Sequence, residues 1–421
     1  MYIVTNCFKM RLKAITLPIL LLVSFLAYAQ TDTQPLPFSV SGIVVDAETE
    51  RPLPYVGVSF SGLKYATVTN TDGIFTLKSS VEPQTVDFSL LGYKTVRIMF
   101  PKDGKPVTVK MPRGSMTLEG ALVIADPYSV LDKAISKIRD NYPREPELFD
   151  CFYRETVQKR HKYIYITEAV SRMYKTSYYR PGLYGDKTAV DKSRILVSPD
   201  KKDTLSVKIV GGPTQAVMLD IVKNDDLLNA RELSNYELRM ELPEMIGDRL
   251  QFAIRLIPRI EQPYPLYNGV IYIDRETYAF TRFELDYDMS DKEKVSRFIL
   301  ISKPPGLRFT PTQVSIRYDY SLSEGVSRVS YVSSTIRFKC DWKKKLLRTD
   351  FTAVSELVTT DRHSGEVDLI PKKEAFSSRD ILSDKAATDF DPEFWKDYNI
   401  IEPTESLDKA INRIVRKTER N

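Results

Sequence analysis

Two blocks of alternating apolar and polar residues occupy most of the chain. In residues 40–111, apolar side chains recur at every second position in seven short runs, as at Phe75 and Leu77. Alternation of this kind predicts strands with one buried face, and the Pro, Gly, Asn and Asp residues between the runs are typical of turns. We therefore expect a small seven-stranded β-sandwich, with strands at Val40–Asp46, Tyr55–Phe60, Lys64–Thr69, Ile74–Leu77, Thr85–Leu90, Lys94–Met99 and Val107–Met111.

The second block, residues 151–360, carries longer alternating runs. The clearest is residues 267–285, where one run ends at Asp274, a turn follows at Arg275-Glu276-Thr277, and a second run returns. This pattern predicts a larger antiparallel sheet, interrupted by a helix over Thr214–Asn229. The predicted fold class is mainly β with a few helices: an N-terminal seven-stranded, prealbumin-like sandwich followed by a larger antiparallel β-sheet domain.

Two amphipathic helices flank the second block. The first has Asp126 as its N-cap and Pro127 in its first turn, and the second follows a C-terminal loop that we expect to dock on the body. Their sequences, VLDKAISKI (130–138) and SLDKAINRI (406–414), are similar, which we interpret as coincidence rather than duplication. The expected organisation is a signal peptide (1–29), the sandwich (38–112), a linker and helix (113–150), the β-rich domain (151–360) and a C-terminal loop and helix (361–421).

The N-terminus is typical of an export signal. Three basic residues and no acid precede an apolar run, Ile15–Leu26, which is short for a membrane span, and Ala27-Tyr28-Ala29 gives a small-x-small cleavage pattern. We expect export and cleavage after Ala29, with an uncleaved anchor as the alternative. No Cys follows the apolar run, so we do not expect a lipid-anchored lipoprotein.

The charge balance gives no reason to expect a nucleic-acid partner. Removal of residues 1–29 lowers the formal net charge from +5 to +2, and nucleic-acid-binding domains are usually strongly basic. The run Lys343-Lys344-Lys345 is interpreted as a solvated turn; the alternative is a site for acidic glycans or lipid head groups.

Three motifs in the first block resemble a known family. They are GIVVDAETERPLPYVGV (42–58), TNTDGIFTL (69–77) and FSLLGY (88–93). Together they resemble the carboxypeptidase-regulatory-like domains, transthyretin-like sandwiches that are abundant in exported proteins of Bacteroidetes-type bacteria. The resemblance implies a sandwich that is not itself a peptidase. Asp72-Gly73 is interpreted as a hairpin turn that favours positive φ, because one acid without a second ligand is not a cation site.

The second block carries two further resemblances. Residues 151–178 resemble a block in large exported Bacteroidetes proteins of unknown function, which begin with the same domain and often continue into an outer-membrane barrel. The hairpin at 267–285 is similar to a strand pair of the curved half-barrels that carry lipoproteins across the periplasm. These resemblances imply an envelope protein whose sheet is either open or curved into a half-barrel.

The sequence contains no recognisable catalytic or metal-binding motif. The only histidines, His161 and His363, lie two hundred residues apart in charged turns, and the chain has no HExxH pair, no GxSxG elbow, and no Walker or dinucleotide glycine motif. We therefore predict no catalytic residue, no metal ligand and no cofactor.

Paired carboxylates leave a glycoside hydrolase as the alternative. Asp274 with Glu276, and Glu155 with Glu168, are the candidate pairs, although each acid is more typical of a solvated or arginine-paired carboxylate. Aromatic residues near strand ends that could stack on sugar rings are Trp342, Trp395, Tyr178 and Tyr179; Trp395 fits better as packing for the C-terminal loop. Cys151 and Cys340 form either a disulfide or two buried thiols.

These observations favour a non-enzymatic, exported cell-envelope protein that acts by binding or assembly. The alternatives are a periplasmic glycan-active or glycan-binding protein and an outer-membrane-associated relative of larger barrel proteins. A barrel is the least favoured, because the strands lack a regular ten-residue spacing and a charged helix closes the sequence. Expected partners are other envelope proteins, a lipid or lipoprotein, or a glycan, with peripheral outer-membrane attachment left open.

Overall fold

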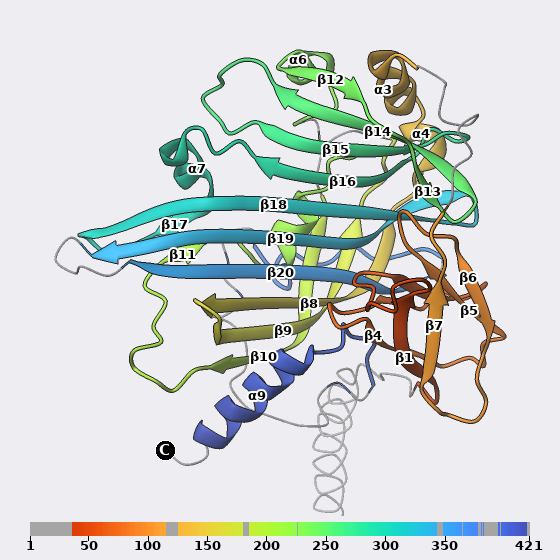
Figure 1. Cartoon of the computed structure of the whole chain (residues 1–421), viewed down its shortest axis with the longest axis horizontal. Helices are drawn as coiled ribbons and strands as arrows, with labels where there is room; N and C mark the ends of the chain where they lie inside the picture. Colours follow the sequence, from red (N-terminus) through yellow and green to blue (C-terminus); the bar gives the residue numbers. More distant parts are fainter. Residues whose placement is uncertain are drawn as a thin grey trace, which may run out of the picture.

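The chain folds into a small β-sandwich packed beside one large antiparallel sheet (Figure 1). This computed structural model describes residues 36–114, 125–179, 185–224, 226–342, 348–363, 365–377, 380, 382, 395 and 397–418. The mainly β fold with few helices is as predicted from the alternation. The predicted signal peptide and Lys343–Lys345 lie outside the described residues. No helix in the described ranges is both long and apolar enough to span a bilayer.

The sandwich consists of two facing sheets. One has the order β4-β1-β7, with β1 and β7 parallel, and the other has the order β3-β2-β5-β6. Alternate side chains of both sheets, among them Val44, Phe75 and Phe88, meet in one core because every second position faces inward. The strands are β1 (Phe38–Asp46), β2 (Gly57–Phe60), β3 (Ala66–Val68), β4 (Ile74–Ser79), β5 (Thr85–Ser89), β6 (Val96–Met99) and β7 (Val107–Met111).

The bend at Asp72-Gly73 has the positive φ that the sequence predicted, but it is not the predicted hairpin turn. It joins β3 to β4, which lie in opposite sheets and pair with β2 and β1. Gly73 has φ +74°, and a Cβ there would lie 2.6 Å from the carbonyl oxygen of Val44. Both the left-handed backbone and the close approach require glycine. The turn is tied together by the Asn70 side chain, whose Oδ1 accepts hydrogen bonds from the backbone N–H groups of Asp72 (2.9 Å) and Ile74 (3.0 Å).

The body is an eleven-stranded antiparallel sheet. Its order is β10-β9-β8-β20-β19-β18-β16-β15-β14-β12, with β13 paired to β14 beside this path. The hairpin predicted at 267–285 is β15–β16, and its resemblance to a half-barrel stays a prediction. The strands are β8 (Glu147–Lys159), β9 (Lys162–Lys175), β10 (Lys187–Val197), β12 (Tyr236–Met240), β13 (Glu244–Ile246), β14 (Arg249–Pro258), β15 (Tyr267–Asp274), β16 (Phe280–Tyr287), β18 (Leu307–Ser323), β19 (Val326–Trp342) and β20 (Thr349–Arg362).

One face of this sheet, which we call the inner face, is covered by short helices and loops. Their apolar residues form a continuous core that reaches from Met173 on β9 to Tyr236 on β12. Asp126 caps α3 as predicted, its Oδ2 accepting the backbone N–H of Ser129 at 2.9 Å. The elements on and around this face are α3 (Pro127–Ser136), α4 (Ile138–Asn141), α5 (Pro213–Met218), α6 (Ala230–Leu233), α7 (Lys292–Ile299) and the two-stranded pair β11 (Lys208–Ile209) and β17 (Leu300–Ser302).

The helix predicted over Thr214–Asn229 is wrong beyond its first turns. The helix α5 ends at Met218, and the described residues that follow form turns. The reason is the buried carboxylate of Asp220, which accepts hydrogen bonds from the hydroxyls of Tyr178 (2.6 Å) and Tyr320 (2.5 Å). Satisfying a buried charge outweighs the helical spacing of the apolar residues around it.

The other face, the outer face, is covered by the sandwich and by the C-terminal region (Figure 1). The helix α9 (Glu405–Thr418) lies against β9 and β10 and buries the predicted stripe of Leu407, Ala410, Ile411 and Ile414. The ring of Trp395 meets that of Phe152 on β8 edge to face, with centroids 5.5 Å apart, so Trp395 packs the C-terminal loop onto the body as expected.

The two cysteines are free buried thiols. Cys151 on β8 packs in the core with Tyr153, whereas Cys340 on β19 belongs to a separate core with Phe338. Of the two possibilities that the sequence left open, the structure therefore has buried thiols.

Candidate binding cleft

A cleft of about 560 Å³ lies between the sandwich and the outer face of the body. One wall is the exposed side of the sheet β3-β2-β5, with the hydroxyls of Ser59, Ser61 and Ser89. The opposite wall is formed by strands β14, β15, β16, β18, β19 and β20, with Gln251 and Thr281 among its polar side chains. Its volume falls within the roughly 300–1,000 Å³ that is usual for small-ligand sites.

Paired charges line the body wall of the cleft. The guanidinium of Arg249 binds the carboxylate of Asp274 in a fork, with distances of 2.7 and 2.6 Å. Asp319 is held in the same way by Arg282 and by Arg317 (2.7 Å each). Burial by itself would raise the pKa of both carboxyls. The arginines, together with two hydrogen bonds from Thr277 to Asp274, outweigh it and lower the pKa of Asp274 and that of Asp319. Both acids are therefore ionised at neutral pH.

The same arginine layer contacts the sandwich directly. The Arg317 guanidinium lies over the rings of Tyr55 from the sandwich (5.1 Å to the centroid) and Tyr331 from β19 (5.6 Å). These two rings are 5.5 Å apart, and the Tyr331 hydroxyl donates to Glu356 at 2.8 Å. This cation–π stack closes one side of the cleft and joins its two walls.

The TNTDG turn holds a C-terminal segment that we call the strap, residues 397–405. The Asn70 side-chain amide donates to the carbonyls of Glu402 (3.2 Å) and Pro403 (3.0 Å). The Asp72 carboxylate accepts the backbone N–H of Glu405, the first residue of α9, at 2.8 Å. An acid at a helix N-terminus is favourable, so this turn is a docking point for the strap as well as a bend.

The body grips the strap from the other side. Arg154 on β8 donates through Nη2 to the carbonyl of Ile401 at 2.7 Å, and its Nε donates to Glu168 at 2.7 Å. Glu168 also accepts from Arg194 at 2.7 Å. Burial would raise the pKa of Glu168, but these two arginines outweigh it and lower the pKa. The strap is thus fixed between the sandwich and a buried ion-pair triad of the body.

A second junction joins the FSLLGY motif to the hairpin strand β13. The backbone N–H of Gly92 donates to the carbonyl of Met245 at 2.6 Å, and that of Gly247 donates to the carbonyl of Tyr93 at 2.9 Å. The Tyr93 hydroxyl in turn donates to Asp46 of the first motif at 2.8 Å. All three sequence motifs therefore take part in a network that fastens the sandwich to itself and to the body.

The carboxylate pairs suggested by the sequence do not form a common site. Glu155 and Glu168 lie on opposite faces: Glu155 is on the inner face, where it accepts hydrogen bonds from the Tyr153 hydroxyl (2.8 Å) and the Gly212 N–H (3.3 Å). Burial raises the pKa of Glu155. Asp274 lines the cleft, but Glu276 is exposed at the hairpin turn.

The two histidines lie at opposite ends of β8. His161 is in the turn after this strand, whereas the His363 N–H donates to Leu148 near its start. A strand of 13 residues separates them by about 40 Å. The His363 ring bonds to the Asp150 carboxylate at 2.9 Å, which raises the pKa of His363. Across the described ranges, no three Asp, Glu, His or Cys side chains gather closely enough to hold a metal ion.

Of the aromatic candidates whose side chains the structure describes, none lines the cleft. Tyr178 is buried beside Asp220, and Tyr179 is exposed with the Arg139 guanidinium 4.7 Å from its ring centre. The side chain of Trp342 lies outside the described part of the structure.

A buried cluster of charges, which the sequence did not lead us to expect, lies beneath the inner face. Lys175 lies 2.5 Å from Asp220 and 3.1 Å from Asp186, and Lys223 lies 2.5 Å from Asp186. Burial, reinforced by the charge of Lys175, lowers the pKa of Lys223 to about 8. The sequence signal for this cluster is the presence of Asp220 and Lys223 among the apolar residues that follow Met218. The prediction of a helix in this segment took no account of these two charges.

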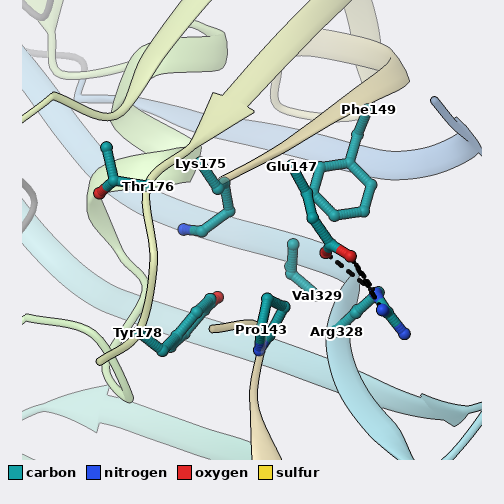
Figure 2. Close-up of a pocket in the computed structure, with 8 residues that line it drawn as sticks. All are labelled: Pro143, Glu147, Phe149, Lys175, Thr176, Tyr178, Arg328 and Val329. Carbon is teal, nitrogen blue, oxygen red and sulfur yellow. Dashed lines mark hydrogen bonds and ion pairs between the residues drawn. The ribbon is translucent and has the colours of Figure 1, made fainter. Parts of the chain in front are cut away.

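Figure 2 shows a small pocket beside this cluster. Lys175 and Tyr178 face it from one side, and the ion pair of Glu147 with Arg328 (2.8 Å) borders the other. The pocket leaves no room for a water molecule, so the cluster is closed to a substrate. The cleft is therefore the better candidate for a binding site.

Comparison with known proteins identifies the sandwich. Residues 40–123 match the family of CarboxypepD_reg-like domains, as the three motifs implied. No curated protein matches the chain.

The solved structures to which the chain is similar have low TM-scores and low sequence identities. They include a DUF1329 family protein from Desulfovibrio piger (12% identity, 56% of this chain and 94% of that one, TM-score 0.23) and MucB (13%, 57% and 94%, TM-score 0.19). A protein of unknown function from Bacteroides fragilis has 9% identity over 78% of this chain and 98% of that one, with a TM-score of 0.15. At these TM-scores, the similarity assigns neither a family nor a function to the body.

Proposed function

We propose that this chain is an exported, non-enzymatic protein of the cell envelope that binds a hydroxyl-rich ligand, an oligosaccharide, in the cleft between its two β modules. The observation that supports the proposal is the lining of the cleft. Serine and threonine hydroxyls, Gln251 and the edges of the Arg–Asp ion pairs offer the many hydrogen-bond donors and acceptors that a hydroxyl-rich ligand requires.

The alternatives fit the cleft less well. A lipid chain would cover the ion pairs Arg249–Asp274 and Arg282–Asp319 and would give them no hydrogen-bond partner in place of water. A glycoside hydrolase needs a protonated acid at neutral pH, whereas the pKa values of Asp274 and Asp319 are lowered. Rigid fastening at the strap and at β13 also suits a preformed site.

The experiment is a calorimetric titration of the exported protein with neutral oligosaccharides released from bacterial envelope polysaccharide. Ser59 lines the cleft from β2, so Ser59→Trp fills it without breaking an ion pair. Ser136→Trp, at the exposed end of α3, is the matched control. We expect saturable binding by the wild type and the control, loss of binding in Ser59→Trp, and unchanged oligosaccharide by mass spectrometry.

Two results would contradict the proposal. Shortened oligosaccharide after incubation would support the hydrolase instead. Equal binding by the wild type and Ser59→Trp would place the ligand outside the cleft.

A further inference from the structure

The end of the body sheet away from the sandwich gathers several loops into one surface (Figure 1, left). There the β8–β9 turn, with Lys159 opposite Lys162, lies beside the start of β20, because Phe351 pairs with Lys159. The neighbouring strands continue the surface: β18 begins at Leu307 opposite Trp342 of β19, and β17 pairs with β11 next to them. We call this surface the basic end.

The basic end carries exposed cations that form no ion pair within the described ranges. Of the acids nearby, Asp200 binds Lys162 and Lys417, Asp203 binds Lys162, and Asp341 lies 3.4 Å from Arg348. Asp291 caps α7, where hydrogen bonds from backbone N–H groups and the charge of Arg297 lower its pKa. Within the described ranges, six exposed cations of the basic end form no ion pair, namely Arg160, Lys201, Lys202, Arg297, Lys303 and Arg308.

Two large apolar side chains protrude among these cations. The helix α7 buries Val295 and Ile299 in the core but leaves Phe298 49% exposed, and Ile301 on β17 is 47% exposed. Both lie within the segment from Arg297 to Lys303. Exposed apolar groups flanked by cations are the pattern of segments that lie in a membrane interface.

We propose that the basic end docks on an anionic lipid membrane, with the six cations at the head groups and with Phe298 and Ile301 inserted at the acyl boundary. The apolar pair decides between a membrane and a soluble polyanion, because only the membrane offers an apolar layer for these side chains. Docked in this way, the protein holds its sandwich away from the lipid surface (Figure 1). The cleft, which the sandwich borders, then also lies away from the lipid. This inference is independent of the ligand bound in the cleft.

The test is sedimentation of the exported protein with vesicles of 30% phosphatidylglycerol in phosphatidylcholine, compared with pure phosphatidylcholine. A cation near such a surface is worth about 1 kcal/mol, so Lys201→Ser with Arg308→Ser should weaken partitioning about 30-fold. The matched control is Lys102→Ser with Lys105→Ser, which removes the same charge from the exposed loop of the sandwich and should leave partitioning unchanged.

A third variant separates lipid insertion from charge attraction. Phe298→Ser should weaken binding to the anionic vesicles by about tenfold. The binding that remains should be abolished by salt, because it then depends only on the attraction between the cations and the anionic head groups. Circular dichroism checks that each variant is folded.

Three outcomes would overturn the proposal. The first is a wild type that stays in the supernatant with anionic vesicles at 50 mM salt, and the second is equal binding by the two double variants. The third is binding to soluble dextran sulfate but not to vesicles, which would assign the basic end to an acidic polysaccharide.

Discussion

The side-chain amide of Asn70 donates a hydrogen bond to the carbonyl of Pro403 at 3.0 Å. This contact joins a turn of the N-terminal sandwich to the strap, more than three hundred residues later. The same side chain organises its own turn through Asp72 and Ile74. A residue that shapes the turn therefore also fixes how the sandwich sits on the body, and the cleft depends on that placement.

We predict that Asn70→Ala destabilises the protein by about 2–4 kcal/mol, because several buried or half-buried hydrogen bonds lose their partner. Hydrogen exchange should rise in the strap and in residues 69–74. Asn412, exposed on α9 and bonded only to the neighbouring turn, gives the control: Asn412→Ala should change stability by less than about 0.5 kcal/mol. Equal effects of the two substitutions would mean that the turn does not hold the strap.

Glu168→Gln should cost about 3–5 kcal/mol at neutral pH, since it leaves Arg154 and Arg194 buried without their anion. The pKa of Glu168 is lowered in the folded state, so its contribution is present above the unfolded value of 4.5 and is lost as the pH falls through the lowered pKa. The difference in the free energy of unfolding between the wild type and the variant should therefore become smaller at acidic pH. Chemical denaturation across this pH range measures it, with the exposed Glu276→Gln as the control; a gap independent of pH would contradict the ion-pair assignment.

Glu155→Gln should change the free energy of unfolding at neutral pH in the opposite direction, so that the protein becomes more stable. Burial raises the pKa of Glu155 above 4.5, so the folded state favours the protonated acid. The stability that this gives is complete below the unfolded pKa and is lost as the pH rises through the raised one. Glutamine keeps the hydrogen bonds of a neutral acid, so the variant should be the more stable at neutral pH, by about 1.4 kcal/mol per unit of raised pKa, and should match the wild type below pH 4.5. Thermal melts at both pH values test this; a less stable variant at neutral pH would show that the carboxylate is needed there.

Both cysteines should resist alkylation in the folded protein. Burial raises the pKa of Cys340 to about 12 and raises that of Cys151 as well, and only the thiolate reacts with iodoacetamide. Intact mass after treatment at pH 8 should be unchanged without denaturant and should show two modified thiols in guanidinium. A disulfide-linked peptide after non-reducing digestion would contradict the free thiols.

The strands and the two long amphipathic helices could be predicted because their apolar periods are local. The stripe Leu407–Ile414 and the alternation at Phe75 and Leu77 need no knowledge of distant residues. The positive φ of Gly73 was predicted for the same reason, but the hairpin was not found, because β3 and β4 pair with strands of different sheets.

The cleft and the partners of the charged residues could not be predicted in this way. Asp274 meets Arg249 only across neighbouring strands, and Asp72 meets Glu405 across a separation of 333 residues in the sequence. The prediction of a helix over Thr214–Asn229 was wrong for the same reason, because Lys175, the ion partner of Asp220, comes from a distant strand. A sequence pattern shows which residues are polar, but the register of a large sheet decides which polar groups meet.

The most direct test of a contact-based function is the calorimetric titration of wild type and Ser59→Trp with neutral envelope oligosaccharides, with the ligand recovered afterwards. Our account predicts saturable binding that the tryptophan abolishes and a ligand recovered intact. Cleaved ligand, or binding that survives in Ser59→Trp, would contradict it.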